Sequence, residues 1–320
     1  MKNNIVVLDG GGVAYDITWP DFTTIGTYTL YDQTKPEEVN ERIKNASIVL
    51  TNKVPLTAQN INNAPNLRYI GCIATGYNHV DIAEAKKHGI VVTNVPDYST
   101  NAVSQLVFAF IMEFTNHAVE HANAVQQGEW ANSKYFCFWK QPVIELAGKT
   151  MGIIGFGNIG RKVGQIASAF GMHVMAYSPR PKPAPAYAPF EFASIEDVFK
   201  KSDFISLHCP LTAENTGMVN ANLLSKMKNS AYIINTARGP LINENDLINA
   251  VQSGQIAGAA LDVVSVEPMD KNSPLCGVKN IMVTPHYAWA SVEARTKLMQ
   301  EVFNNTAAFL AGNSANVVNP

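Results

Sequence analysis

Short apolar runs alternate with helix-like segments along the chain, and this alternation restricts the fold more than any other feature. In the first hundred residues, four runs have the length of buried strands: Ile5–Leu8, Ser47–Thr51, Tyr69–Ile73 and Val91–Asn94. Three segments between them have helical spacing: Pro36–Lys44, Thr57–Asn63 and Asp81–His88. Strands that alternate with helices favour a parallel sheet covered on both faces. We therefore predict an α/β fold with doubly wound sheets.

A second series of the same kind begins after Gly148, with a helix at Gly160–Phe170. Its strands are expected at Thr150–Ile154, His173–Tyr177, Phe204–Leu207, Ala231–Asn235, Gly258–Val263 and Ile281–Val283. Two long apolar-rich helices, Asn101–Glu120 and Ser291–Leu310, would carry the chain between two lobes and back. We therefore predict a discontinuous first domain, residues 1–100 plus 291–320, and a second domain, residues 101–290. The proline-rich run Pro179–Pro189 cannot be helical and is expected to be a surface connection.

Composition and charge exclude several classes of function. The net charge is -2 and no basic block stands out, so we expect no nucleic-acid partner. No apolar stretch approaches the roughly 18 residues of a membrane span, and the run that ends at Asp9 is too short for a signal peptide. The four cysteines are scattered and the His and Cys residues lack metal-ligand spacing, so we expect a cytoplasmic protein without disulfides or a metal.

A glycine-rich turn follows the predicted strand Thr150–Ile154 and opens the next helix. It reads Gly155-Phe156-Gly157-Asn158-Ile159-Gly160, a G-x-G-x-x-G in the context that a dinucleotide site requires. Gly155 permits the tight turn, Gly157 lets the backbone approach a pyrophosphate, and Gly160 lets the helix pack on the strand. The helix start favours the anion. The alternative is a glycine-rich turn that binds no ligand.

The end of the strand His173–Tyr177 bears on the choice of cofactor. An NAD site usually presents Asp or Glu there to the adenosine ribose, whereas this chain has Ser178-Pro179-Arg180. No carboxylate would repel a 2′-phosphate, and Arg180 is able to pair with one. We therefore expect NAD(H) or NADP(H) as the cofactor. The alternative is that Arg180 points to solvent and Ser178 binds the ribose.

Polar residues follow three predicted strands in the second half of the chain. They are Arg238, Asp262, Glu267 and His286. Ligands of open α/β sheets bind beyond the carboxyl ends of the strands, so these side chains should converge near the dinucleotide. An arginine grips a carboxylate and polarises the adjacent carbonyl, and a histidine donates a proton as hydride reaches carbon. A glutamate supports the imidazolium, and Asp262 would orient the nicotinamide. Taken singly, each residue has the alternative of being an ordinary surface, loop or turn residue without a catalytic role.

At these residues the chain resembles the D-2-hydroxyacid dehydrogenase family, most specifically in Asn235-Thr236-Ala237-Arg238-Gly239-Pro240-Leu241. The resemblance implies that Arg238, Glu267 and His286 are catalytic, with His286 as the acid and base. It also implies that the backbone N–H groups of Ala74-Thr75-Gly76 hold the substrate carboxylate together with Arg238; an ordinary strand-to-helix turn is the alternative there. Cofactor contacts implied by the family or by position are Thr75, Asn158, Ile159, Cys209, Pro210, Thr236, Ala237, Asp262 and His286.

The family resemblance also implies an architecture. A flavodoxin-like substrate-binding domain and an NAD(P)-binding Rossmann domain would close over a cleft, and the protein would be a homodimer. The segment Asn101–Glu120 is similar to the dimerisation segment of the family. The chain is expected to take a small 2-keto or 2-hydroxy acid as its substrate.

Within the family, the chain is most similar to the glycerate dehydrogenase (hydroxypyruvate reductase) branch. Three pieces carry this likeness: 95–105, Phe138-Trp139-Lys140 and 286–290. The expected substrates are hydroxypyruvate or glyoxylate. A D-lactate-type specificity and a dinucleotide-sensing, corepressor-like protein are the alternatives. Ser178 departs from the common acidic residue, and Glu267 separates the chain from the formate dehydrogenase branch, which has Gln there.

Overall fold

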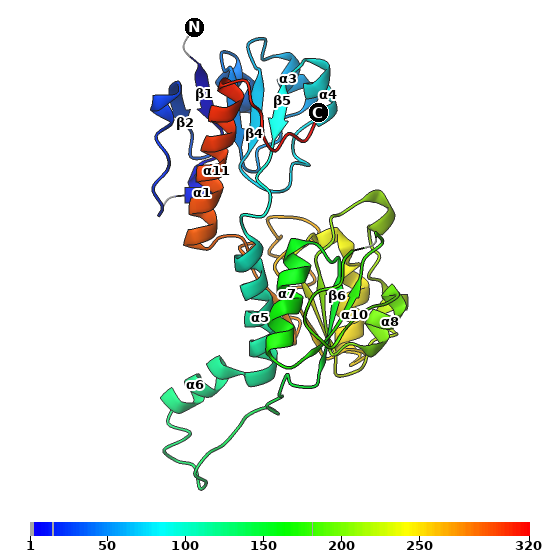
Figure 1. The fold of residues 1–320 in the computed structure, drawn as a ribbon. Helices are drawn as coiled ribbons and strands as arrows, with labels where there is room; N and C mark the ends of the chain where they lie inside the picture. Colours follow the sequence, from blue (N-terminus) through cyan, green and yellow to red (C-terminus); the bar gives the residue numbers. More distant parts are fainter. Residues whose placement is uncertain (1–2, 15, 181) are drawn as a thin grey trace. The chain divides into compact units, whose positions relative to one another are not determined.

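Two compact units make up the chain in the computed structural model, which describes residues 3–14, 16–180 and 182–320 (Figure 1). Unit 1 combines Met1–Ser99 with Trp289–Pro320, and unit 2 is Thr100–Ala288. Each unit contains one parallel sheet with helices on its faces. The predicted α/β fold with two doubly wound sheets is therefore confirmed.

The sheet of unit 1 has five strands in the order β2-β1-β3-β4-β5. The strands are β1 (Asn4–Val7), β2 (Thr27–Leu30), β3 (Ile48–Thr51), β4 (Tyr69–Cys72) and β5 (Val91–Thr93). This is the flavodoxin-like order, and its direction reverses between β1 and β3. The central strands β3 and β4 are buried along their whole length, which explains their unbroken apolar sequence.

Helices on both faces cover this sheet. They are α1 (Gly11–Ala14), α2 (Val39–Ile43), α3 (Ala58–Asn62), α4 (Ile82–Lys87) and α11 (Val292–Leu310), with 3₁₀ turns at Phe22–Thr24 and Pro36–Glu38. Side chains of Thr57, Asp81 and Ser291 accept hydrogen bonds from backbone N–H groups of the first turns of α3, α4 and α11. These capping residues explain why the helices begin where the sequence predicts.

Unit 2 contains a seven-stranded sheet in the order β12-β11-β10-β9-β6-β7-β8. Its strands are β6 (Thr150–Ile154), β7 (His173–Tyr177), β8 (Phe190–Phe192), β9 (Phe204–Leu207), β10 (Tyr232–Asn235), β11 (Gly258–Leu261) and β12 (Ile281–Val283). Counted from β6, this is the Rossmann order 3-2-1-4-5-6 with one further strand. The order reverses between β6 and β9, so a crevice for a ligand is expected at their carboxyl ends.

Two apolar layers sandwich the sheet of unit 2. The helices are α5 (Thr100–Asn116), α6 (Ala118–Gln126), α7 (Asn158–Ala169), α8 (Ile195–Lys201), α9 (Ala221–Leu224) and α10 (Glu244–Gln252). Residues of α5 and α7 pack with Ile153 on one face, whereas residues of α8, α9 and α10 pack with Ile154 on the other. Neighbouring residues of β6 therefore serve opposite cores, as the two-residue period of a strand requires.

Three local features differ from the sequence expectations, and the proline-rich run agrees with them over its described residues. The predicted helix Asn101–Glu120 is interrupted at His117, which has a left-handed conformation (φ 50°) between α5 and α6. The 3₁₀ turn at Pro36–Glu38 replaces the first part of the helix predicted at Pro36–Lys44. Strands β2 and β8 were not predicted. The described part of Pro179–Pro189 contains neither helix nor strand, and Pro181 lies outside the described residues.

Candidate active site

The glycine-rich turn lies where the strand order of unit 2 reverses. Gly155 has φ +96°, and a Cβ there would lie 2.7 Å from the backbone N of Cys209, just after β9. A Cβ on Gly160 would lie 2.2 Å from the carbonyl oxygen of Gly155, so α7 packs directly on the turn. At Gly157 a Cβ would meet nothing within 4 Å among the described residues. The first and third glycines are thus needed by the fold, whereas the second leaves open space.

Aromatic side chains hold this turn against the edge of the sheet. Phe156, between the first two glycines, is 1% exposed, and its ring centroid lies 5.1 Å from that of Phe190 and 5.5 Å from that of Phe192. The Arg161 guanidinium lies 4.7 Å from the same ring, and its Nη2 donates to the carbonyl oxygen of Pro183. Strand β8, which the sequence did not predict, therefore supports the glycine-rich turn.

The end of β7 has the polar character that the sequence predicted. Ser178 Oγ donates to the carbonyl oxygen of Arg180 (2.9 Å), and Arg180 is exposed. Elsewhere at this edge, Thr236 Oγ1 is buried and has no hydrogen-bond partner among the described residues. An orphaned hydroxyl after β10, together with the open space at Gly157, fits a dinucleotide laid across the carboxyl ends of the strands.

An imidazole and a carboxylate meet beyond β11 and β12. His286 Nδ1 lies 2.7 Å from Glu267 Oε2, and Glu267 Oε1 accepts a hydrogen bond from the backbone N–H of Val264 (3.1 Å). Gly239 packs on this loop so closely that a Cβ there would lie 2.0 Å from the carbonyl carbon of Val264. Arg238, directly before Gly239, is therefore brought to the same region. Its Nη1 donates to the carbonyl oxygen of Ala237 (2.7 Å).

Asp262 holds the segment that carries the imidazole. It is 1% exposed, and its carboxylate accepts hydrogen bonds from Thr284 Oγ1 (2.6 Å), Tyr287 N (3.1 Å) and Ala288 N (2.8 Å). Burial raises the pKa of this carboxyl group, while these hydrogen bonds oppose the rise. These contacts show what orders the segment around His286. A contact of Asp262 with the nicotinamide stays a prediction.

A partly buried histidine beside the turn was missed by sequence reasoning. His208 follows β9, donates its backbone N–H to Ile154 O (2.7 Å), and its Nε2 lies 2.8 Å from Ser206 Oγ. Burial lowers the pKa of this imidazole to about 3, so the ring is neutral. Burial also raises the pKa of the adjacent Cys209 thiol to about 11. The thiol is therefore protonated at neutral pH and is not a nucleophile.

The predicted substrate loop, Ala74-Thr75-Gly76, follows β4 at the carboxyl edge of the sheet in unit 1. Thr75 Oγ1 donates to the carbonyl oxygen of Val95 (2.8 Å), just after β5. The side chain of Asn94 also donates to the loop, at Thr75 O, and that of Asn52 donates to Ile73 O directly before it; sequence reasoning missed both asparagines. Each directly follows a strand, β3 or β5, which is the same signal that pointed to Asp262.

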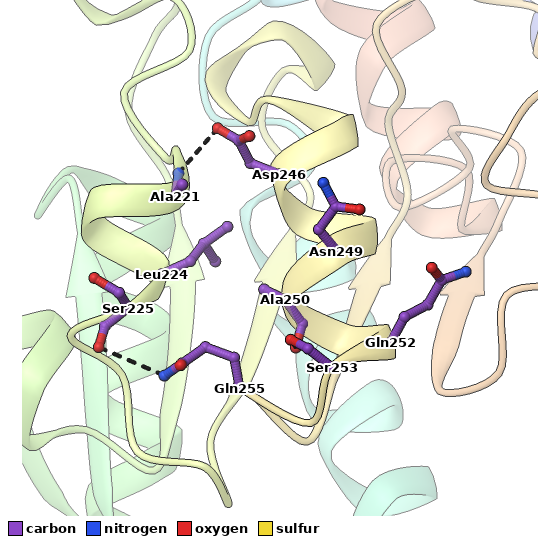
Figure 2. A pocket seen from close by; sticks show the side chains of 9 residues that line it. All are labelled: Ala221, Leu224, Ser225, Asp246, Asn249, Ala250, Gln252, Ser253 and Gln255. Carbon is purple, nitrogen blue, oxygen red and sulfur yellow. Dashed lines mark hydrogen bonds between the residues drawn. The ribbon is translucent and has the colours of Figure 1, made fainter.

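A surface depression of about 530 Å³ lies apart from these residues, between α9 and α10 (Figure 2). Leu224 and Ala250 line it together with polar side chains. Asp246 accepts a hydrogen bond from Ala221 N, and Gln255 donates to Ser225 O, so these polar groups serve the packing of the two helices. None of its lining residues is a predicted site residue.

The described residues contain neither a membrane-spanning helix nor a cluster of metal ligands. No helix in 3–14, 16–180 or 182–320 is both long and apolar enough to cross a membrane. In the same ranges, no group of three or more His, Cys, Asp or Glu residues is arranged to hold a metal ion.

Comparison with known proteins agrees with this geometry. A family model described as D-isomer specific 2-hydroxyacid dehydrogenase, NAD binding domain, matches residues 108–288. A hydroxypyruvate reductase of Blautia hydrogenotrophica is 44% identical over 319 residues, covering 98% of this chain and 99% of that protein. A glycerate dehydrogenase of Methylorubrum extorquens is 39% identical over 321 residues, covering 99% of each.

Solved structures agree as well. The NADPH-dependent glyoxylate/hydroxypyruvate reductase of Sinorhizobium meliloti, in complex with NADP and malonate, superposes with a TM-score of 0.84 at 25% identity, covering 99% of this chain and 97% of that one. The glycine turn, the strand order and the matched residues all lie in unit 2. The chain therefore belongs to the D-isomer specific 2-hydroxyacid dehydrogenase family, and it is an NAD(P)-dependent oxidoreductase.

Proposed function

We propose that this enzyme reduces hydroxypyruvate or glyoxylate with NAD(P)H, forming D-glycerate or glycolate. The observation that carries the chemistry is the 2.7 Å contact between His286 Nδ1 and Glu267 Oε2, in the unit that also contains the glycine turn. The small-acid specificity is supported by the two relatives that match nearly the whole chain.

The proposed roles follow from the chemistry of each side chain. The bound nicotinamide supplies a hydride to the keto carbon. His286 donates the proton from Nε2 to the carbonyl oxygen, so that the carbonyl group gains one hydride and one proton and becomes an alcohol. Glu267 fixes the ring through Nδ1 and stabilises the imidazolium before the transfer. Arg238 grips the substrate carboxylate and polarises the carbonyl.

Unit 1 is proposed as the substrate-binding domain and unit 2 as the cofactor-binding domain. The loop Ala74–Gly76 would bind the substrate carboxylate together with Arg238. The predicted cofactor contacts after β6, β9, β10 and β11 keep their proposed roles, supported by the open space at Gly157 and the orphaned hydroxyl of Thr236.

We propose NADPH as the better cofactor, although the fold also admits NADH. Ser178 and the exposed Arg180 stand where an acidic residue would repel a 2′-phosphate. A guanidinium at this position has the charge and the donors to bind that phosphate.

A homodimer working in a reducing cytoplasm completes the proposal. The segment after α5 carries exposed apolar side chains, among them Tyr135 (78% exposed), Phe136 (92%) and Trp139 (68%). Such a patch marks an interface between protein chains. All four cysteines are free, which supports a reducing compartment.

Steady-state assays with hydroxypyruvate, glyoxylate, pyruvate and a bulkier branched 2-keto acid, each with NADH and with NADPH, test the function. We expect the highest kcat/KM with hydroxypyruvate or glyoxylate, and a lower KM for NADPH than for NADH. A highest kcat/KM with pyruvate would favour the D-lactate-type alternative. Cofactor binding without turnover of any keto acid would contradict the proposed function.

A further inference from the structure

The carbonyl oxygens of three consecutive residues, Ile73, Ala74 and Thr75, lie at the start of the substrate loop of unit 1, and each accepts a hydrogen bond. Asn52 Nδ2 donates to Ile73 O (2.6 Å), Val95 N donates to Ala74 O (2.9 Å), and Asn94 Nδ2 donates to Thr75 O (2.7 Å). Two of these three donors are asparagine side chains that come from the ends of other strands, β3 and β5.

The N–H groups of the same peptides are available. Among residues 3–14, 16–180 and 182–320, none accepts a hydrogen bond from the backbone N–H of Ala74, Thr75 or Gly76. Each peptide unit is planar, with its C=O and N–H on opposite sides. Holding the oxygens of Ile73, Ala74 and Thr75 therefore fixes the directions of these three N–H groups. Successive oriented N–H groups form a binding site for an anion.

Asn94 is itself held by residues more than two hundred positions away. Asn305 Nδ2 donates to Asn94 O (3.0 Å), and Asn94 N donates to Asn316 O (3.2 Å). Asn316 Nδ2 in turn donates to Asn305 Oδ1 (2.9 Å). Asn305 lies on α11 and is 3% exposed, and the segment that follows α11 pairs with β5 through Val318 N and Val92 O (2.9 Å).

Asn52 has comparable support at the other side of the loop. It is 7% exposed, and its backbone N–H donates to Asp9 Oδ1 (2.8 Å). The same carboxylate accepts a hydrogen bond from Val54 N (3.0 Å). Asp9 follows β1, so the end of a third strand fixes the position of this asparagine.

We propose that Asn52 and Asn94 are positioning residues that preset the Ala74–Gly76 N–H groups for the carboxylate of the substrate. Asn305 and Asn316 complete this device by holding Asn94, so the segment after α11 contributes to substrate affinity without touching the substrate. This inference rests on the proposed function, because that function places a carboxylate at this loop. Neutral amides suit the task, since they orient peptides without adding a charge that would compete for the anion.

Three variants test the device, and each removes one amide. Asn94→Ala and Asn52→Ala free one carbonyl oxygen each. Asn316→Gly removes the outermost amide; its φ of +55° suits glycine, and the position is exposed, so this variant should fold even where a buried one does not. Asn40→Ala is the matched control, because Asn40 Oδ1 accepts a hydrogen bond from Asn60 Nδ2 (2.9 Å) in the same unit without any hydrogen bond to the loop.

Three quantities are measured for each variant: KM and kcat with hydroxypyruvate, the Kd of NADPH from fluorescence titration, and the Kd of oxamate, an unreactive amide analogue of a 2-keto acid, for the NADPH complex. Loss of a single orienting hydrogen bond should raise KM and the Kd of oxamate about tenfold in Asn94→Ala and Asn52→Ala, and about threefold in Asn316→Gly. We expect kcat and the Kd of NADPH to change less than about twofold, because the defect lies in carboxylate binding. Asn40→Ala should match the wild type.

The outcomes separate this inference from the proposed function. Wild-type turnover combined with unchanged KM and oxamate Kd in Asn94→Ala and Asn316→Gly would overturn the inference alone. A wild type that binds oxamate but reduces no keto acid would overturn the proposed function, while weaker oxamate binding in the variants would still support the inference. A wild type that does neither would overturn both.

Discussion

At the scale of single residues, the contact between His286 and Glu267 concentrates the proposed chemistry in two side chains. Glu267 uses one oxygen on Val264 N and the other on the imidazole, so its position and its charge are separable by mutation. Glutamine keeps the length and the acceptor for Val264 N but removes the charge that supports an imidazolium.

We therefore expect Glu267→Gln to lower kcat with hydroxypyruvate about 100-fold, the order that general acid catalysis contributes. The Kd of NADPH should stay within about twofold of the wild-type value, because Glu267 is not among the predicted cofactor contacts. Stopped-flow and steady-state absorbance at the nicotinamide band measure these quantities. His286→Ala serves as the reference, and a Glu267→Gln enzyme of wild-type kcat would remove Glu267 from the mechanism.

His208 leads to a prediction about stability rather than activity. Its folded pKa of about 3 lies below the ordinary value of 6.5, so below pH 6.5 the unfolded chain binds a proton that the folded chain does not. This group therefore leaves stability unaffected above pH 6.5 and lowers it progressively as the pH falls from 6.5 toward 3. Urea unfolding measures the free energy of unfolding at pH 7 and at pH 5. The decrease between these two pH values should be smaller by about 1–2 kcal/mol in His208→Gln than in the wild type.

Glutamine at 208 retains a hydrogen-bonding partner for Ser206, so the variant differs from the wild type mainly in lacking a titratable group. His173→Gln, at the exposed start of β7, is the matched control and should lose stability with pH as the wild type does. An equal loss in wild type and His208→Gln would mean that the imidazole is hydrated in the folded state.

At this scale the sequence predicts the candidate site residues for a definite physical reason. Arg238, Asp262 and His286 each follow an apolar strand, and parallel strands bring their carboxyl ends to one edge. The residues that hold the predicted substrate loop Ala74–Gly76 were not predictable in this way. The pairing of Asn94 with Asn305 joins residues 211 positions apart, and nothing in either local sequence specifies the other.

At the scale of elements, the turn between β6 and α7 separates the needs of the fold from those of the ligand. A Cβ on Gly160 would collide with the backbone at 2.2 Å, whereas a Cβ on Gly157 would enter open space. The φ of Gly157 is -84°, which alanine adopts without strain. The two glycines therefore predict opposite phenotypes.

Gly157→Ala should keep the wild-type melting temperature and raise the Kd of NADPH about tenfold or more, because the methyl group occupies the space of the pyrophosphate. Gly160→Ala should lower the melting temperature by several degrees, because overpacking reduces the free energy of unfolding by about 1–3 kcal/mol. Differential scanning fluorimetry and fluorescence titration distinguish the two. Unchanged cofactor affinity in Gly157→Ala would show that this face of the turn is not the phosphate site.

The elements that were not predicted from the sequence have only weak local sequence patterns. Strand β2 buries little of itself, and β8 has three residues, so neither has the apolar run that marks a central strand. The break between α5 and α6 depends on the left-handed conformation of His117, which the apolar pattern on either side does not reveal. The long central strands and the capped helices were predicted because burial and capping leave traces in the sequence.

At the scale of the whole molecule, the segment formed by α6 and the following loop extends away from the sheet of unit 2 (Figure 1). Its internal contacts include a hydrogen bond from Trp130 Nε1 to Phe136 O, an ion pair of Lys140 Nζ with Glu129 Oε1 (2.7 Å), and a contact between the His121 and Phe138 rings, whose centroids lie 6.4 Å apart. A segment with exposed rings and so little packing of its own gains stability when a second chain covers it.

We expect the wild type to have twice the chain mass of 34.8 kDa in sedimentation equilibrium, and the double variant Phe136→Ser, Trp139→Ser to shift toward the single-chain mass. Removing two exposed rings costs a monomer little, whereas each contributes about 2 kcal/mol or more if buried in an interface. Val292→Ser removes an exposed apolar side chain of α11 and should leave the mass unchanged. A double variant that stays at twice the chain mass would place the interface elsewhere.

The division of unit 1 between two distant stretches of chain has a consequence for biosynthesis. Unit 2 is continuous from Thr100 to Ala288, so it is able to fold as soon as it leaves the ribosome. The sheet of unit 1 emerges earlier, yet α11 and the strand-like segment at Val317 that pairs with Thr93 arrive only after unit 2 has been translated. Until then, the nascent unit 1 has an open sheet edge and an apolar face that α11 does not yet cover. We expect chaperones to act at this stage of synthesis.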